Sequence, residues 1–319
     1  PEKSTVTFFT PDTKEYNVHP QVFLRNKLVR LEQKPKLLGV TFDALHKFNH
    51  HINLAINNAR SKINILKQLA GSNWGQDKKT IVNTYKSIGR SVLEYGCQIW
   101  GPIISPSLWI KLQTLQNQAL RIATGCLKMT NADHLHQETK VLPLRPHVTL
   151  LTQQFLLANH LPGHPGQKHL YRPPPPKNMK RTLLQYDDDI QHLLPVDSRS
   201  SCKAGMKSLH TTAVASVISN YDNNRVLQCK PPQLSAEESL LSRNIQTKLA
   251  QLRSGFSWKL NYYRNRIDPE IPDTCPLCSN SPHDVHHLFN CPANPTNLTP
   301  LDLWKKPREA AHFLQLEAD

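Results

Sequence analysis

The sequence predicts a mainly α-helical protein with a small β-rich start and a small metal-stabilised module at its C-terminal end. Three observations lead to this class. From Ile52 onward, apolar residues recur at helical spacing through most of the chain, whereas residues 4–9 and 21–31 are β-branched or alternate between apolar and polar. Near the C-terminal end, three cysteines and a histidine have the spacing of metal ligands. A length of 319 residues allows two or three domains with cores of their own.

The charge of the chain is strongly basic and unevenly distributed. The formal net charge is +15, which favours a polyanionic partner such as nucleic acid. Residues 275–319 contain three Lys or Arg and five Asp or Glu, so this end carries −2 and the preceding part carries +17. We therefore expect the basic binding surface to lie before the cysteine cluster.

Cysteine usage and hydropathy indicate the compartment. Four of the seven cysteines stand alone in the sequence: Cys97, Cys126, Cys202 and Cys229. This pattern is not a disulfide framework and fits the reducing cytoplasm or nucleus. No apolar run approaches the ~20 residues that span a bilayer, and the first residues do not read as a signal peptide. We expect an intracellular protein with no membrane partner.

The first 48 residues predict short strands. Residues 4–9 and 21–31 read as a strand and a hairpin, with Pro11, Asp12 and Asn26 as turn residues. A further apolar run over residues 37–42 leads from a strand into a helix near Ile52.

Three helices with short connections follow and predict a bundle. Their apolar faces cover residues 52–71, 77–92 and 107–125, and two of them end at a glycine. Three basic residues lie on the other faces of the first helix: Arg60, Lys62 and Lys67. A helix over residues 147–160 comes next, and the proline-rich stretch 161–176 predicts an extended linker.

The remaining chain is predicted to contain three further helical regions. Residues 203–221 read as a helix in a weakly patterned region. Ser235 and Glu238 form a capping box that opens a helix ending at Gly255. A last helix starts at Thr299, restarts at Pro307 and is expected to pack on the metal module.

Basic and aromatic residues alternate between residues 253 and 266. The basic ones are Arg253, Lys259, Arg264 and Arg266, and the aromatic ones are Phe256, Trp258, Tyr262 and Tyr263. These side chains could contact phosphates and stack on bases, or the aromatic ones could pack beneath the metal loop. Helical spacing does not separate the two interpretations.

The cysteine cluster predicts one structural zinc site of the CCHC type. Cys275 and Cys278 are separated by two residues, and His287 and Cys291 complete four ligands after a short loop. His286 competes with His287, because moving by one residue only changes the gap before Cys291. His283 is a weaker third candidate.

Several of these segments together resemble one family. They are Lys3 to Phe9, Leu38-Gly39-Val40-Thr41-Phe42-Asp43 with Phe48 and His51, Tyr95-Gly96-Cys97-Gln98-Ile99-Trp100, Leu115 to Gly125, Leu249 to Gly255, and the CCHC cluster. Together they resemble the pol protein of jockey-like non-LTR retrotransposons, from the end of the reverse transcriptase palm through the thumb to the C-terminal cluster. The resemblance leaves out the variable region around residues 160–230.

The resemblance implies a nucleic-acid partner and identifies candidate contacts. It places Lys3 just after the catalytic strand pair and Gly39 in a primer-grip-like turn, where backbone would approach nucleic acid closely. The candidate nucleic-acid contacts are Lys3, Gly39, Arg60, Lys62, Lys67, Arg121, Arg253, Arg264 and Arg266. The implied partners are RNA and DNA as template-primer, and the upstream polymerase and endonuclease regions of the same polyprotein.

The catalytic carboxylates of the family are expected upstream of Pro1, so we predict no catalytic residue and no activity for this chain alone. Polymerases hold Mg²⁺ with converging carboxylates, and Mg²⁺ is therefore expected only in the full-length parent. Tyr186-Asp187-Asp188-Asp189 matches a Tyr-x-Asp-Asp signature but follows the bundle, and we interpret it as solvated acids of a loop or helix start.

The predicted organisation has four parts. Residues 1–48 are the end of a palm, 49–160 a helical thumb, 161–234 a linker with a weakly patterned region, and 235–319 a nucleic-acid-binding end with the zinc cluster. Two alternatives stay open: a stand-alone, domesticated nucleic-acid-binding zinc protein, and the inert product of a truncated element.

Overall fold

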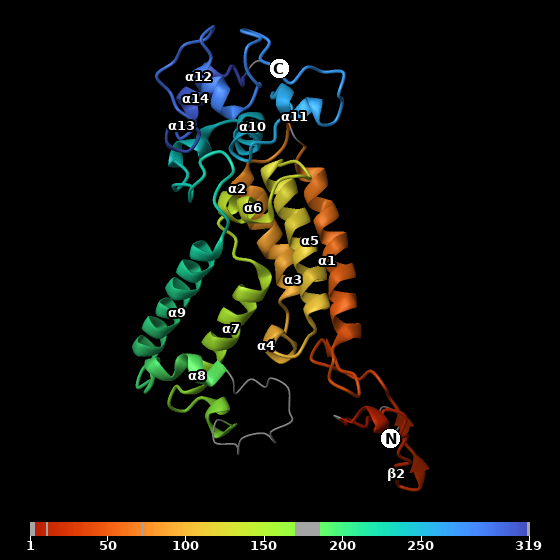
Figure 1. The fold of residues 1–319 in the computed structure, drawn as a ribbon. Helices are drawn as coiled ribbons and strands as arrows, with labels where there is room; N and C mark the ends of the chain where they lie inside the picture. The colour runs from red at the N-terminus through yellow and green to blue at the C-terminus, as the bar shows by residue number, and fades with distance from the viewer. Residues whose placement is uncertain (1–3, 11, 72, 170–185, 318–319) are drawn as a thin grey trace. The chain divides into compact units, whose positions relative to one another are not determined.

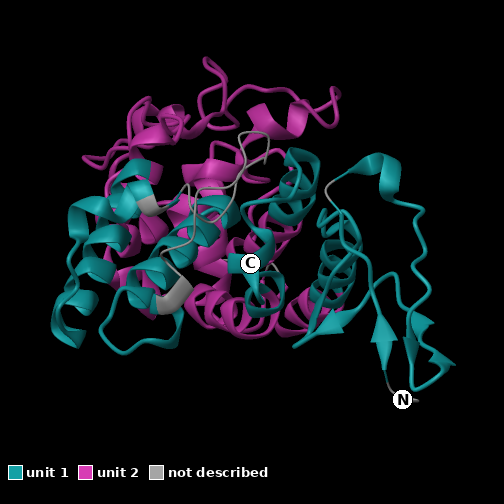
Figure 2. Ribbon diagram, turned by 90° about the horizontal axis from the view of Figure 1, so that it is seen from below, with its two compact units in different colours: residues 1–60, 90–114, 143–216 teal, residues 61–89, 115–142, 217–319 magenta. Residues whose placement is uncertain are grey.

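The computed structural model describes residues 4–10, 12–71, 73–169 and 186–317. The described chain is mainly helical, with three two-stranded sheets, which confirms the predicted fold class (Figure 1). It divides into two compact units that are each built from separate stretches of sequence (Figure 2). The first unit contains residues 1–60, 90–114 and 143–216, and the second contains residues 61–89, 115–142 and 217–319. The four predicted domain ranges remain a prediction.

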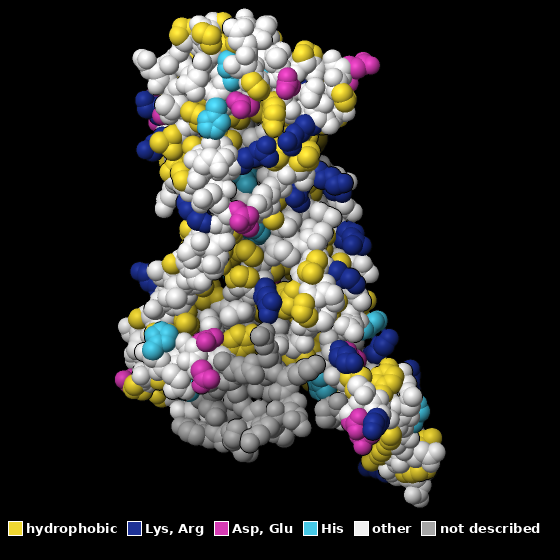
Figure 3. Space-filling view, viewed as in Figure 1, with side chains coloured by type: hydrophobic (Ala, Val, Ile, Leu, Met, Phe, Trp, Pro, Cys, Tyr) yellow, Lys and Arg dark blue, Asp and Glu magenta, His cyan; other side chains and the backbone are white. Residues whose placement is uncertain are grey.

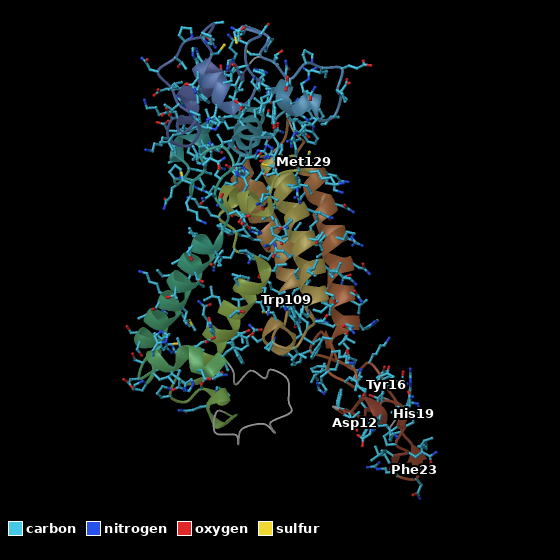
Figure 4. The ribbon with its side chains drawn as sticks, viewed as in Figure 1. Asp12, Tyr16, His19, Phe23, Trp109 and Met129 are labelled. Atoms are coloured by element: carbon cyan, nitrogen blue, oxygen red, sulfur yellow. The ribbon has the colours of Figure 1, made fainter. Side chains whose placement is uncertain are left out.

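The N-terminal part of the first unit has very short strands. Parallel β1 and β4 are Thr5–Val6 and Arg30–Leu31, and the hairpins are β2 with β3 (Phe23–Leu24, Lys27–Leu28) and β5 with β6 (Lys36–Leu37, Val40–Thr41). The apolar run predicted as one strand is thus a hairpin that turns at Leu38 and Gly39. Several aromatic and aliphatic side chains stay exposed here, among them Tyr16 and Phe23 (Figure 4).

The first unit contains several helices and a buried tryptophan pair. They include α4 (Cys97–Trp100), α7 (Leu144–Asn159), α8 (Asp187–Ile190) and most of α9 (Arg199–Asn220), with the beginnings of α1 (Asn49–Leu69) and α5 (Pro106–Thr124). The rings of Trp100 and Trp109 are 5.8 Å apart and both are buried. The helices predicted over 52–71, 107–125, 147–160 and 203–221 are therefore present, with ends displaced by a few residues.

The helix predicted over residues 77–92 has three successive parts. It consists of α2 (Lys78–Thr84), a π-helical stretch over Tyr85–Arg90 and α3 (Ser91–Leu93). Asp77 caps its start by accepting from the backbone N–H of Thr80 at 3.1 Å. Tyr85 is fully buried in the second unit and donates its hydroxyl to Gln116 at 3.1 Å.

The C-terminal part of the second unit has its own apolar core. Its elements are a 3-10 turn over Ala236–Leu240, α10 (Arg243–Arg253), α11 (Asn261–Asn265), α12 (Val285–Asn290), α13 (Asp302–Lys305) and α14 (Pro307–Phe313), whereas α6 (Ala132–Thr139) belongs to an earlier stretch of the same unit. Leu249, Leu260, Phe289 and Trp304 are among the buried residues that pack together. The last two helices thus pack with α12, as predicted.

The prediction of a single helix from Ser235 to Gly255 is wrong. The chain forms the 3-10 turn, leaves helical geometry at Leu241 and starts again at α10. Ser242 caps the new start by accepting from the N–H of Ile245 at 3.5 Å. The predicted capping box does not form as expected, because the Glu238 carboxylate instead binds two cations in the interior.

Candidate metal centre and nucleic-acid interface

The three cysteines and one histidine predicted to bind metal come together. One ligand atom from each of Cys275, Cys278, His287 and Cys291 can be chosen so that all four lie within 4.8 Å of one another. The sulfurs of Cys275 and Cys291 are 3.8 Å apart, and the Cys278 sulfur is 3.2 Å from Nε2 of His287. Two thiolates about 2.3 Å from one tetrahedral zinc ion would be separated by about 3.8 Å. The donor set therefore fits a four-coordinate metal.

A tight turn and a helix start position these ligands. The backbone N–H of Ser279 donates to the carbonyl of Cys275 at 2.9 Å, and the N–H of Leu277 donates to the Cys275 sulfur at 3.4 Å. Asp284 caps α12 by accepting from the N–H of His287 at 2.8 Å. Helix α12 starts directly after this cap, so His287 lies in its first turn. The helix is six residues long, and Cys291 is its C-terminal cap.

The hydrogen bonds of the turn favour the metal-binding form of Cys275. Burial by itself raises the pKa of this thiol, but hydrogen bonds from the backbone N–H groups of Cys278 and Leu277, together with the side chains of His287 and Cys291, lower the pKa to about 7. Metal ligation requires the thiolate, and a lowered pKa reduces the free-energy cost of deprotonating the thiol.

The two competing histidines lie in different environments from His287. His286 is exposed on α12. His283 is buried, and its Nδ1 accepts the backbone N–H of Asn261 at 3.1 Å. Among the described residues, the metal-holding group contains His287 and neither of these two.

The basic residues predicted on the first helix lie on its surface. Arg60, Lys62 and Lys67 are exposed on α1, a helix that contains no Asp or Glu. Lys and Arg side chains lie along α1 on the face shown in Figure 3. Lys3 lies outside the described residues. Arg121 is half-buried and donates to the carbonyl of Thr130 at 3.1 Å.

The prediction of a phosphate contact for Arg253 is wrong. Its side chain is 0% exposed and binds the carboxylates of Glu138 and Glu238 at 3.2 and 2.6 Å. It also donates to the carbonyl of Leu303 at 2.6 Å. Lys78 completes the group by binding the same two carboxylates at 2.8 and 2.6 Å. A guanidinium enclosed in this way cannot reach a phosphate.

This buried ion cluster fixes the charge of its members. Burial opposes ionisation of Glu138, but Lys78 and Arg253 outweigh it and hold the pKa of this carboxyl far below its usual range. Sequence reasoning missed Lys78 and Glu138, because their partners lie far away in the chain and no local spacing links them. A second arginine of α10, Arg243, donates to the carbonyls of Ile122 and Ala123.

The basic residues after α10 have the exposure expected of binding residues. Arg264 and Arg266 are exposed on and just after α11. The guanidinium of Arg266 lies 5.2 Å from the ring centroid of Tyr262 and donates to its hydroxyl at 3.3 Å. Such a stacked arginine has a defined direction in which to meet a phosphate or a base.

The aromatic residues divide between the two interpretations left open by the sequence. Phe256 and Tyr263 are buried and belong to the apolar core. Trp258 remains 53% exposed while its ring packs edge-on against Tyr263 at 5.2 Å. Packing therefore accounts for the first two, and Trp258 keeps an accessible ring face for stacking.

The primer-grip-like turn and the acidic signature are both exposed, but the first is a hairpin and the second is helical. Gly39 is exposed at the tip of the β5–β6 hairpin with φ of 88°. Asp188 and Asp189 are exposed on the short α8, and Asp189 accepts from the Gln153 amide at 2.9 Å. Helical rather than hairpin geometry agrees with the interpretation of these acids as a helix start.

No helix among the described residues has both the length and the apolar character needed to cross a bilayer.

Comparison with known proteins gives a consistent set of relatives. The chain is 29% identical over 147 residues to the RNA-directed DNA polymerase from mobile element jockey of Drosophila melanogaster, covering 46% of this chain and 16% of the relative. It is 26% identical over 164 residues to the probable RNA-directed DNA polymerase from transposon X-element, covering 51% and 18%. For the probable RNA-directed DNA polymerase from transposon BS the identity is 23% over 155 residues, covering 49% and 17%.

No family model and no solved structure matches the chain. The matched part of this chain spans less than a fifth of the length of these relatives. Over about half its length the chain is thus similar to Drosophila retrotransposon RNA-directed DNA polymerases, which confirms the resemblance to jockey-like reverse transcriptases.

Proposed function

We propose that this chain is the C-terminal part of a retrotransposon reverse transcriptase and binds RNA and DNA template-primer without supplying catalytic carboxylates. The observation that carries the proposal is the similarity to three RNA-directed DNA polymerases. The net charge of +15 and the exposed basic residues of α1 support it, because phosphate neutralisation dominates nucleic-acid affinity.

Two surfaces supply the contacts in this proposal. Arg60, Lys62 and Lys67 bind phosphates from one helix that has no acidic side chain to repel them. Arg264 and Arg266 bind phosphates near Trp258, whose exposed ring stacks on a base. The Gly39 turn approaches the primer end with its backbone.

The metal in this proposal is a structural zinc ion held by Cys275, Cys278, His287 and Cys291. Four protein ligands fill a tetrahedral site, so the ion stabilises the fold of residues 274–291 and leaves no position for a catalytic water. The zinc stoichiometry of the full chain, purified under reducing conditions without chelator, tests this. About one zinc ion per chain is expected, and less than about half would rule the site out.

Nucleic-acid binding is tested by fluorescence anisotropy with a primed RNA template. Between about 50 and 200 mM salt, log Kobs should fall with a slope of about −0.7 to −0.9 per phosphate neutralised. Affinity that does not depend on salt, or no binding at the lower salt concentration, would overturn the proposal. Nucleotide incorporation by this chain alone, lost on changing Asp188 and Asp189, would overturn its non-catalytic part.

A further inference from the structure

The turn at Leu38 and Gly39 has a strained backbone at an exposed position. Both residues have positive φ, 46° and 88°, as a two-residue hairpin of the type I′ class requires. Glycine adopts this conformation readily, but a leucine there is disfavoured by about 1–2 kcal/mol. Leu38 is also 86% exposed, so its own side chain adds little packing to hold the turn. Something outside the hairpin must stabilise it.

Tyr95 supplies that support from a distant part of the sequence in the same unit. Its hydroxyl donates to the carbonyl of Leu38 at 2.8 Å. Its ring lies so close to Gly39 that an added Cβ would come within 2.9 Å of Cε1. The ring therefore occupies the space that any other residue at position 39 would need, and the hydroxyl fixes the orientation of the preceding peptide.

The residues around Tyr95 hold it in this position. Trp100, which is buried, donates its indole N–H to the carbonyl of Tyr95 at 3.0 Å. Gly96 has φ of 63°, and an added Cβ would lie 2.7 Å from the Val40 side chain. Two separate sequence segments, Leu38-Gly39-Val40 and Tyr95 to Trp100, are thus complementary parts of one contact.

The other end of the hairpin is fixed as well. The backbone N–H of Thr41 donates to Nδ1 of His51, on the buried side of α1, at 3.3 Å. Lys34 and Lys36 are exposed beside the turn, and residues 33–42 contain no acid. The exposed tip of the hairpin is therefore flanked by two lysines, with Glu32 and Asp43 just outside this stretch.

Tyr95 itself is 55% exposed, which is unusual for a residue kept only for core packing. We propose that Tyr95 is a positioning residue: it holds the Leu38–Gly39 turn in one conformation so that the tip of the turn contacts the primer end of bound template-primer. The part of this inference that concerns the primer rests on the proposed function. The support of the turn by Tyr95 does not.

The first experiment tests the support without any nucleic acid. Hydrogen-deuterium exchange of peptides covering residues 36–41 is compared between the wild type, Tyr95→Phe and Tyr16→Phe. Tyr95→Phe removes one hydroxyl and keeps the ring, so exchange should become about two- to tenfold faster, as for the loss of one net hydrogen bond. Tyr16 is a matched control, because it is 53% exposed and lies in the same N-terminal stretch as the hairpin. Unchanged exchange in Tyr95→Phe would overturn the inference.

The second experiment tests the consequence for binding. Anisotropy compares a template-primer with a recessed 3′ end and a blunt duplex of equal length. The wild type should prefer the recessed end, and Tyr95→Phe should lose most of that preference while its affinity for the blunt duplex stays the same. Faster exchange with an unchanged preference would overturn the positioning role. If the wild type binds neither ligand, the proposed function fails, and the exchange experiment still decides whether Tyr95 supports the turn.

Discussion

Helices α10 and α11 lie eight residues apart in the sequence and use similar side chains in opposite ways. In α10, Arg243 and Arg253 are buried and bind carbonyls and carboxylates inside the second unit. In and after α11, Arg264 and Arg266 are exposed, and one of them lies over a tyrosine ring. The comparison teaches that a run of arginines between apolar residues does not by itself indicate a binding face.

The two helices are also held by different interactions. Arg253 joins α10 to Glu138, whose carboxylate also binds Lys78, and both of these residues lie in the bundle part of the sequence. α11 is tied to the cysteine loop, since the backbone N–H of Asn261 donates to His283 and the Asn261 amide donates to the carbonyl of Thr274. Besides the apolar core to which both helices contribute, an ion cluster holds α10, and the loop that carries the candidate metal ligands holds α11.

Loss of the metal should produce the largest difference in stability between α10 and α11. Because structural zinc contributes about 10–16 kcal/mol to small sites, we expect His287→Ala, or a chelator, to unfold residues 261–291. α10 should keep most of its protection through its own contacts. Peptide-resolved hydrogen exchange measures both regions in one sample. His286→Ala is the matched control, and an equal loss of zinc in both variants would contradict the assignment of the ligand.

Breaking the ion cluster should have the next largest effect. Arg253→Met leaves two buried carboxylates with Lys78 as their remaining cation, and removing one partner of a buried pair typically costs about 3–5 kcal/mol. Urea unfolding followed by circular dichroism gives the change in unfolding free energy. Arg266→Met removes an exposed arginine from the same stretch and should change it by no more than about 0.5 kcal/mol. Equal effects of the two substitutions would contradict the difference between the two helices.

The ion cluster should also make the unfolding free energy depend on pH. The folded pKa of Glu138 is lowered, so the protein gains stability from this carboxylate above its unfolded pKa of about 4.3 and loses it as pH falls towards the folded pKa. Below about pH 4.3 the unfolding free energy of the wild type should therefore fall more steeply than that of Glu138→Gln. Parallel curves for the two proteins would show that Glu138 titrates alike in both states.

Substitutions in the exposed arginines should affect binding and little else. Arg264→Met with Arg266→Met should reduce the salt slope of log Kobs by about 0.7–0.9 for each phosphate that these arginines neutralise in the wild type, with stability nearly unchanged. Arg308→Met is the control, because Arg308 is also exposed but lies in the C-terminal part with net negative charge. A slope that drops equally in the control would indicate general charge attraction and no defined interface at α11.

Local sequence patterns were enough to predict the long helices and the cysteine cluster. The helices at 49–69 and 106–124 follow from apolar spacing over many turns, which one stretch of sequence contains in full. The CCHC cluster follows from a short loop, because ligands a few residues apart can reach one metal whatever surrounds them. The sequence assigned His287 with His286 as a competitor, and in the structure it is His287, next to the cap at Asp284, that lies with the three cysteines.

The sequence by itself determined the helical class, the three cysteines of the candidate metal site and the resemblance to retrotransposon polymerases. Only the tertiary structure decided which arginines are free to bind, because Glu138 lies 115 residues before Arg253 and nothing in the local pattern links them. It also brought the Tyr95 hydroxyl within hydrogen-bonding distance of the turn 57 residues earlier. Burial and long-range hydrogen bonding depend on which distant segments meet, and a periodicity read along the chain contains only the neighbours of each residue.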